Sequence, residues 1–366
     1  MDEGVRAAWE VLHHGHPDPL VVAAAAEVVK AHADAAQLRA LHRQSLAQPE
    51  VLDPTGRLID PAPAEVATAL TWSTGTARAR LDLAHTLVTE LPQVLDALDR
   101  GDIDLAKARE IALGTCELDP TDRTRLAARA AGYASTRTCG QLRAWLARQV
   151  AALDPDAAGR RHRKAAAKRR VWIHPESDGM ATVGAYLTAE QAQAVWESVS
   201  AAAASIEGGV DAARADMFVA RLTGLDVGTP VPVTVLQTDT GPEIAGYGPI
   251  TGAHHASLCD GQPTIRLTPP APTPGYRPAP ALARWIRAVH RHCRFPGCRR
   301  PATACDLDHL IPWPTGRTTP SNLAPLCRYH HRLKTHTRWT VTPLPDGRLQ
   351  WTSPTGRTYI THPHDP

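Results

Sequence analysis

The part of the sequence richest in reactive side chains lies near its C-terminus, where four of the seven cysteines fall within 35 residues. Cys293 and Cys298 are separated by four residues, and Cys327 and His330 by two. Thiolate and imidazole are ligands that tetrahedral zinc prefers, and a closed four-ligand site leaves no position for a substrate. The spacing therefore predicts a structural zinc ion that stabilises a segment with few apolar residues. Two alternatives stay open: Cys305 replaces one of the four ligands, or the thiols are free and buried.

A second group of polar side chains in the same segment is not needed for zinc. Asp308 and His309 are adjacent, so on a strand they point to opposite faces, and one can hold a metal while the other meets a water molecule. On a helix, His331 projects about 100° away from His330 and can reach toward Asp308. Lys334 lies one turn beyond His331, where it can meet a phosphate. Each histidine alone is typical of an ordinary core or surface position, but the combination indicates a catalytic site.

The charge distribution indicates a polyanionic partner. Residues 281–340 contain ten arginines and one lysine against two aspartates, a charge of +9 in a chain whose net charge is +3. A polyanion is therefore expected to bind in this part of the chain. A second basic run at 160–170, with Arg160, Arg161, Arg163 and Lys164, contains no acid. This run is either a solvated helix face or a contact with nucleic acid, and the sequence leaves both open.

The elements that position these residues follow from hydrophobic spacing. Apolar residues at three- and four-residue intervals predict helices from residue 20 to about 225. We divide the chain into a helical domain at 1–225, a short strand region and proline-rich linker at 226–280, a small domain at 281–340, and a hairpin with a loose tail at 341–366. Seven prolines in residues 263–280 favour a stiff linker there.

The C-terminal segment resembles an HNH endonuclease of the ββα-metal kind. It contains Cys-Arg-Phe-Pro-Gly-Cys at 293–298, Cys-Asp-Leu-Asp-His at 305–309, Asn-Leu-Ala-Pro-Leu-Cys at 322–327 and His-His-Arg-Leu-Lys-Thr at 330–335. More closely, the chain resembles a large actinobacterial family that joins such a nuclease to a helical domain of unknown function 222, the thirteen-E-twelve repeat family. The C-terminal likeness covers about residues 276–340, and a more diffuse likeness covers much of 60–250.

This resemblance implies a mainly α N-terminal domain followed by a small α+β nuclease domain of the ββα-metal type. It implies that His309 is the general base for water, that Asp308 and His331 hold a divalent ion at the scissile phosphate, and that Asn322 orients His309 or joins the metal. The carboxylate and imidazole ligands favour Mg²⁺ or Mn²⁺ as this ion, and another divalent ion stays open. Phosphodiester hydrolysis needs such a base and such a cation on the phosphoryl oxygens. His330 stands where many members have cysteine, and imidazole can replace that thiolate as a zinc ligand.

We therefore predict a metal-dependent endonuclease that hydrolyses DNA; the alternative is a zinc-stabilised DNA-binding module without nuclease activity. Contacts with DNA are expected from Lys334, Arg332 and the basic run, and no small-molecule cofactor is expected. The longest apolar stretch, Leu20 to Val29, is broken by Glu27 and is too short to span a membrane. The acidic start, Met1-Asp2-Glu3, lacks the basic residues of a secretory signal, so we expect a cytoplasmic protein.

Overall fold

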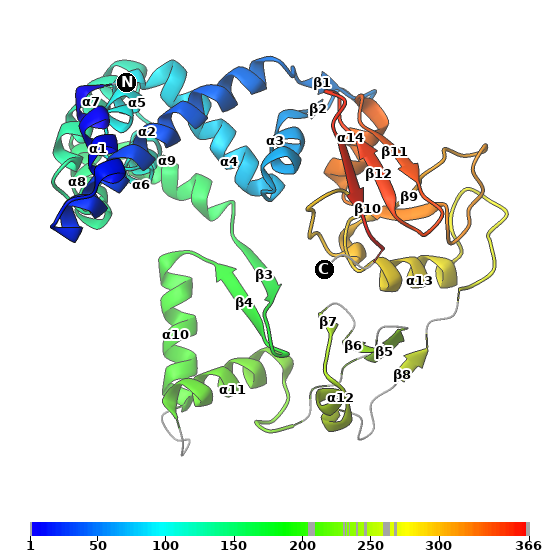
Figure 1. The fold of residues 1–366 in the computed structure, drawn as a ribbon. Coiled ribbons are helices and arrows are strands. Elements are labelled where there is room, and N and C mark those ends of the chain that lie inside the picture. The colour runs from blue at the N-terminus through cyan, green and yellow to red at the C-terminus, as the bar shows by residue number, and fades with distance from the viewer. Residues whose placement is uncertain are drawn as a thin grey trace.

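A computed structural model describes residues 2–203, 209–229, 231, 233, 235–238, 241–244, 247–258, 264–266 and 269–363. Figure 1 shows a helical N-terminal part in blue to green, a small sheet near the middle of the chain, and a C-terminal unit of strands and helices in yellow to red. The predicted order of a mainly α domain followed by a small α+β domain is confirmed. No helix of the described residues is both long and apolar enough to cross a bilayer.

Helices dominate the N-terminal part, and most of them begin at a side-chain cap. Asp18, Ser73, Asp104 and Thr138 each accept a hydrogen bond from a backbone N–H of the helix that follows, which satisfies a donor that has no partner within the helix. The apolar faces of the helices between residues 31 and 150 meet in one core of mostly leucine and alanine side chains. The helices are α1 (Glu3–His14), α2 (Pro19–Leu46), α3 (Ala62–Leu70), α4 (Thr74–His85), a π-helical turn (Thr86–Glu90), α5 (Pro92–Asp99), α6 (Leu105–Gly114), α7 (Pro120–Ala134), α8 (Cys139–Leu153), α9 (Pro155–Ala166), α10 (Ala189–Ala203) and α11 (Val210–Thr223).

The expectation of helices throughout 20–225 is wrong in two places. Strands β1 (Val51–Leu52) and β2 (Leu58–Ile59) form one hairpin, and β3 (Arg170–Pro175) and β4 (Ala181–Tyr186) form another. Strand β3 contains Val171, Trp172 and Ile173, and β-branched and aromatic side chains favour extended backbone. Asp178 and Gly179 both have positive φ in the turn between β3 and β4, a geometry that suits a tight hairpin turn.

The middle of the chain forms a four-stranded sheet of order β7-β6-β5-β8. Its strands are β5 (Val235–Thr238), β6 (Gly241–Ile244), β7 (Gly248–Pro249) and β8 (Thr264–Arg266), and helix α12 (Gly252–Leu258) connects β7 to β8. The short strand expected in this region is β5. Some residues before it, including 232 and 234, lie outside the described residues.

The C-terminal unit is built around two antiparallel strands and a helix. Helix α13 (Pro280–His290) is followed by a 3-10 turn (Ala302–Ala304), β9 (Asp306–His309), β10 (Leu323–Leu326) and α14 (Arg328–His336). A second sheet of order β11-β12-β13 is made of Thr340–Pro343, Leu349–Thr352 and Thr358–Thr361. The expected hairpin is thus β11 and β12, but the expectation of a loose tail is wrong for 358–361, because Tyr359 and Ile360 pair with β12 as a third strand.

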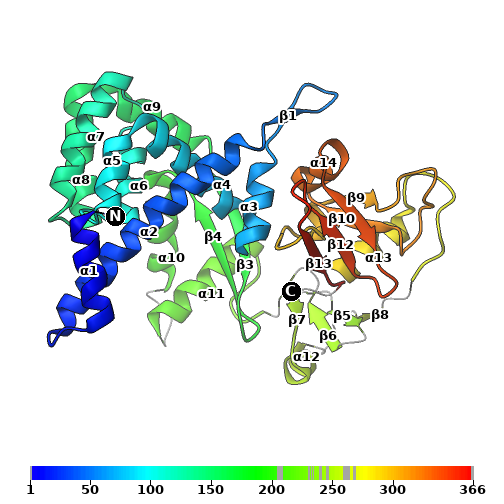
Figure 2. The ribbon, with the colours of Figure 1, turned by 45° about the horizontal axis from the view of Figure 1, so that its top comes forward.

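The helical part, which has its own core, also contributes two buried residues to the hydrophobic core of the C-terminal unit. Ile59 of β2 and Ala64 of α3 are buried in the same cluster as Phe295, Trp339 and Trp351. Both ribbon views place β1 and α3 beside α14 (Figures 1 and 2). The C-terminal core is therefore completed by residues more than 200 positions earlier in the chain.

Candidate metal centre and active site

Three thiols and one imidazole meet at the start of α14. The ligand atoms of Cys293, Cys298, Cys327 and His330 all lie within 4.8 Å of one another. The Nδ1 atom of His330 is 3.5 Å from Cys293 Sγ and 3.3 Å from Cys327 Sγ. Three sulfurs and one nitrogen facing a common point are a donor set that suits tetrahedral zinc. This cluster could hold a zinc ion, as the spacing of the four residues predicts.

The backbone around this cluster brings two distant segments together. The knuckle, residues 293–298, turns at Gly297, whose φ of 70° is left-handed, while Cys327 and His330 lie at the N-cap and in the first turn of α14. The backbone N–H of Cys327 donates to Cys293 Sγ at 3.3 Å. The ring of Phe295 stacks on His330 with centroids 3.9 Å apart. The imidazole is thus fixed by packing as well as by its sulfur neighbours.

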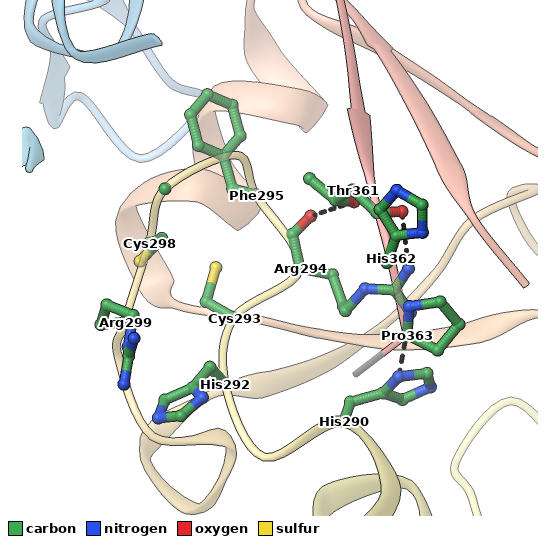
Figure 3. A pocket seen from close by; sticks show the side chains of 11 residues that line it. His290, His292, Cys293, Arg294, Phe295, Cys298, Arg299, Thr361, His362 and Pro363 are labelled. Atoms are coloured by element: carbon green, nitrogen blue, oxygen red, sulfur yellow. Dashed lines mark hydrogen bonds between the residues drawn. The ribbon is translucent and has the colours of Figure 1, made fainter. Parts of the chain in front are cut away.

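The sheet β11-β12-β13 and the turns beside it support the knuckle. Figure 3 shows the side chain of Arg294 reaching from the knuckle to His290 and to Thr361 of β13. Its guanidinium is 2.9 Å from His290 Nδ1 and donates to the carbonyl of Gly347 at 3.0 Å, and Trp351 Nε1 donates to the carbonyl of Arg294 at 2.9 Å. The buried Arg294 therefore connects the metal cluster to the sheet β11-β12-β13.

The thiols of the cluster differ in their tendency to ionise. Burial raises the pKa of Cys293 well above its usual range. Hydrogen bonds from the Cys293 and Cys298 thiols hold the pKa of Cys327 far below its usual range. The thiolate form of Cys327 is therefore favoured over the thiol. Ionisation of all three thiols in so buried a place requires a cation beside them.

Cys305 is close to this cluster but is not a member of it. Its thiol is buried and donates to the carbonyl of Pro301 at 3.3 Å. Among the described residues, the possible metal ligands that lie together are Cys293, Cys298, Cys327 and His330, and Cys305 is not one of them. The alternative in which Cys305 replaces one of the four ligands is therefore not favoured.

A second polar cluster lies between β9 and α14. Asp306 and Asp308 are two residues apart on β9 and so lie on the same face, toward His331 of α14. The Nδ1 atom of His331 is 2.9 Å from Asp306 Oδ2, and its Nε2 atom is 3.5 Å from Asp308 Oδ1. The expected proximity of His331 to Asp308 is present. The contact with Asp306 was not expected, although the i, i+2 spacing on the strand was a sufficient signal for it.

His309 occupies the opposite side of β9 and is almost completely buried, with 4% of its surface exposed. Its Nε2 atom is 2.9 Å from the hydroxyl of Thr318, and that hydroxyl donates to the carbonyl of Gly275 at 2.7 Å. The ring of Tyr276 stacks on the imidazole, with centroids 5.2 Å apart. Burial, with a smaller effect of Lys334, lowers the pKa of His309 in spite of the neighbouring Asp308. The imidazole is therefore neutral near pH 7.

Two family profiles match the chain that carries these clusters. The profile described as the domain of unknown function DUF222 matches residues 22–217, more than half of the 366 residues. The chain belongs to this family. A second profile, described as HNH endonuclease, matches residues 291–337, which contain both polar clusters. The chain therefore combines a DUF222 domain with an HNH domain.

Curated relatives of this DUF222 protein carry no functional description. The uncharacterized protein Rv3776 of Mycobacterium tuberculosis (strain ATCC 25618 / H37Rv) is 54% identical over 91 residues, which are 25% of this chain and 18% of that protein. The uncharacterized protein Rv2100 of the same strain is 54% identical over 94 residues, which are 25% of this chain and 17% of that protein. The matches thus span less than a fifth of these relatives. No solved structure matches the chain.

Asn322 of the HNH domain holds a loop. Its Oδ1 atom accepts from the backbone N–H of Ile311 at 2.8 Å, and its Nδ2 atom donates to the carbonyls of Ile311 at 3.1 Å and Arg317 at 2.9 Å. We expected Asn322 to orient His309 or to join the metal, and its amide instead bonds the backbone of this loop. The loop leads to Thr318, so the structure connects Asn322 to His309 only through this loop. Gly316 leaves room for the amide, since a Cβ there would lie 2.4 Å from Asn322 Nδ2.

The basic residues expected to contact DNA are mostly engaged within the chain. Lys334 Nζ donates to Asp308 Oδ2 at 2.8 Å and to the carbonyl of His309 at 2.7 Å, so its charge lies beside the second polar cluster. Arg332 instead forms an ion pair with Asp53, 2.8 Å away, and donates to the carbonyls of Arg57 and Leu58. Arg332 therefore connects α14 to the hairpin of β1 and β2, a contact that the sequence could not indicate across 279 residues.

The basic run at 160–170 lies largely on α9 and is partly neutralised. Lys164 contacts the carboxylate of Glu117 at 2.7 Å, Arg160 contacts Asp154, and Arg161 donates to the carbonyl of Gly114. Arg163, also on α9, is exposed. Three of these four basic side chains therefore have partners within the helical part. A contact of this run with nucleic acid stays a prediction.

Proposed function

We propose that this protein is an endonuclease that hydrolyses phosphodiester bonds in DNA with the help of a divalent ion. The observation that supports the proposal is the placement of a candidate general base and a candidate cation-binding pair on the two sides of β9. The buried, neutral His309 lies on one side of the strand, and the acidic and imidazole groups of Asp308 and His331 lie on the other. A base and a cation-binding pair on one short strand are the two components that phosphodiester hydrolysis requires.

His309 is the general base in this proposal, acting through its Nδ1 atom. Because the Thr318 hydroxyl donates its proton to the carbonyl of Gly275 at 2.7 Å, its oxygen is available to accept from Nε2–H of His309 at 2.9 Å. The neutral imidazole then carries its proton on Nε2 and presents the Nδ1 lone pair. That lone pair takes the proton of the attacking water.

Asp308 and His331 would hold the divalent ion. A carboxylate oxygen and an imidazole nitrogen suit Mg²⁺ or Mn²⁺, with water in the remaining positions. When bound, the ion supplies positive charge to the phosphoryl oxygens and the leaving oxygen. Asp306 accepts from Nδ1–H of His331 and so presents the Nε2 lone pair toward Asp308. Lys334 adds a second positive charge beside the same carboxylate.

The cluster of Cys293, Cys298, Cys327 and His330 has a structural role in this proposal. It is buried and made of four ligands, so it leaves no position for a substrate. A zinc ion there would fix the start of α14 relative to the knuckle and thereby place His331.

Incubation of the purified protein with supercoiled plasmid tests the proposal. We expect relaxed and linear plasmid when Mg²⁺ or Mn²⁺ is added, no cleavage after mild chelation, and recovery on adding the ion again. Elemental analysis should find about one zinc per chain throughout. Binding of the plasmid without cleavage under every divalent ion would favour a zinc-stabilised DNA-binding module instead.

A further inference from the structure

We propose that Tyr276 and Trp313 form a subsite on which an unpaired nucleobase of the DNA strand stacks beside His309. The preferred substrate is then single-stranded or locally unpaired DNA rather than an intact duplex. This inference rests on the proposed nuclease function and adds the substrate class to it.

The rings of Tyr276 and Trp313 lie beside His309, the proposed general base, and both are exposed to solvent. Tyr276 is 59% exposed and Trp313 is 38% exposed, whereas His309 is 4% exposed. The ring centroid of Tyr276 is 5.2 Å from that of His309 in a stacked arrangement, and the centroid of Trp313 is 6.2 Å from it. Tyr276 therefore uses one face for the imidazole and keeps much of its remaining surface open to solvent. Exposed rings beside a reactive group are typical of surfaces that bind unpaired bases.

Tyr276 is carried by a segment that is fixed to the HNH domain. The residues before α13, which we expected to form a stiff linker, contact the loop at 318. The backbone N–H of Thr273 donates to the carbonyl of Thr318 at 2.9 Å. The Thr318 hydroxyl in turn donates to Gly275, as described above. The buried side chain of Thr318 thus anchors the chain on one side of Tyr276.

Trp313 is also carried by a fixed backbone. The loop from Ile311 to Arg317 is closed by three hydrogen bonds of the buried Asn322 amide and by the backbone N–H of Gly316, which donates to the carbonyl of Pro312 at 2.8 Å. A ring on backbone that is fixed before binding has less conformational freedom to lose when a nucleobase stacks on it. The fixed loops therefore favour a binding role for these rings.

The charges beside the two rings favour nucleic acid over an apolar protein partner. Arg277 follows Tyr276 directly, and Arg317 lies four residues after Trp313; both are exposed. Within the described part of the chain, neither arginine forms an ion pair. Two unneutralised guanidinium groups near an aromatic pair match the phosphates on either side of a stacked base.

Binding of labelled oligonucleotides to the full chain, without added divalent ion, tests this subsite. The probes are a 12-nucleotide thymidine strand and a strand of equal length with abasic deoxyribose at every position, so that both carry the same phosphates. Stacking of one base typically changes affinity by about 5- to 150-fold. We expect the wild-type chain to bind the thymidine strand more tightly by a factor in this range, and the Tyr276→Ala, Trp313→Ala double variant to bind both strands equally.

Matched variants separate stacking from charge and from misfolding. Trp9→Ala removes an exposed tryptophan of α1 and should leave the preference for bases unchanged, whereas Arg317→Ala should weaken both probes alike. Tyr276→Phe with Trp313→Phe keeps two rings and should retain the preference. Equal binding of the two probes by the wild-type chain, or a preference that survives loss of both rings, would overturn the inference. A preference for bases in a protein that never cleaves plasmid would instead contradict only the nuclease function.

Discussion

Replacing Thr318 by valine removes the hydroxyl that fixes His309 while keeping nearly the same side-chain volume. In the proposed mechanism His309 becomes positively charged when it takes the proton from water, and Nε2–H then donates a charge-assisted hydrogen bond to Thr318, which is 2.9 Å away in the structure. A hydrogen bond to a charged group contributes about 1.5–3 kcal/mol. Its loss from a buried imidazole should therefore lower kcat by about 10- to 150-fold. KM should change little, because the fully buried Thr318 cannot contact DNA.

Initial rates of plasmid nicking at saturating Mg²⁺, measured over a range of plasmid concentrations, give kcat and KM for this comparison. Thr318→Ser restores the hydroxyl and should recover most of the rate, while Thr315→Val changes an exposed threonine of the same loop and should have no effect. A Thr318→Val protein with the wild-type kcat, or a serine variant as slow as the valine variant, would refute the assignment of Thr318 as the positioning residue of His309.

Three further predictions follow from the two clusters and the shared core. Asp306→Asn should weaken Mn²⁺ binding by about 10- to 100-fold in titration calorimetry, because the residue orients His331; unchanged affinity would contradict that role. Cys327→Ser should lose zinc, whereas Cys305→Ser should retain it. The opposite result in elemental analysis would show that Cys305 is the ligand and Cys327 is not. Ile59→Ala should lower the free energy of unfolding by about 2–5 kcal/mol and make zinc easier to chelate; independence of zinc retention from this change would contradict the shared core.

The metal cluster could be predicted from the sequence because its ligands come as two short pairs. Cys293 with Cys298 and Cys327 with His330 each lie within one turn or knuckle, so spacing alone restricts their geometry. The same holds for Asp308 and His331, since strand and helix periodicity determine which faces they occupy. The sequence alone therefore predicts which residues of the site lie near one another when they belong to the same strand, helix or turn.

Contacts between distant segments could not be predicted in this way. Thr318 and Tyr276 reach His309 only because the loop after β9 and the segment before α13 meet in space. Arg332 pairs with Asp53 across 279 residues, and no local pattern in the sequence distinguishes this arginine from one that contacts phosphate. Nor does composition indicate that Ile59, in a part expected to be helical, belongs to the core of the HNH domain.

The central claim, that His309 activates water in a DNA endonuclease, is tested most directly by comparing plasmid cleavage by the wild-type chain and by His309→Ala. Zinc content and DNA affinity are measured on the same preparations. Loss of a general base typically lowers the rate by about 10²- to 10⁴-fold, so we predict a loss of this size with zinc content and DNA affinity nearly unchanged. Plasmid nicking by His309→Ala at close to the wild-type rate would contradict the account.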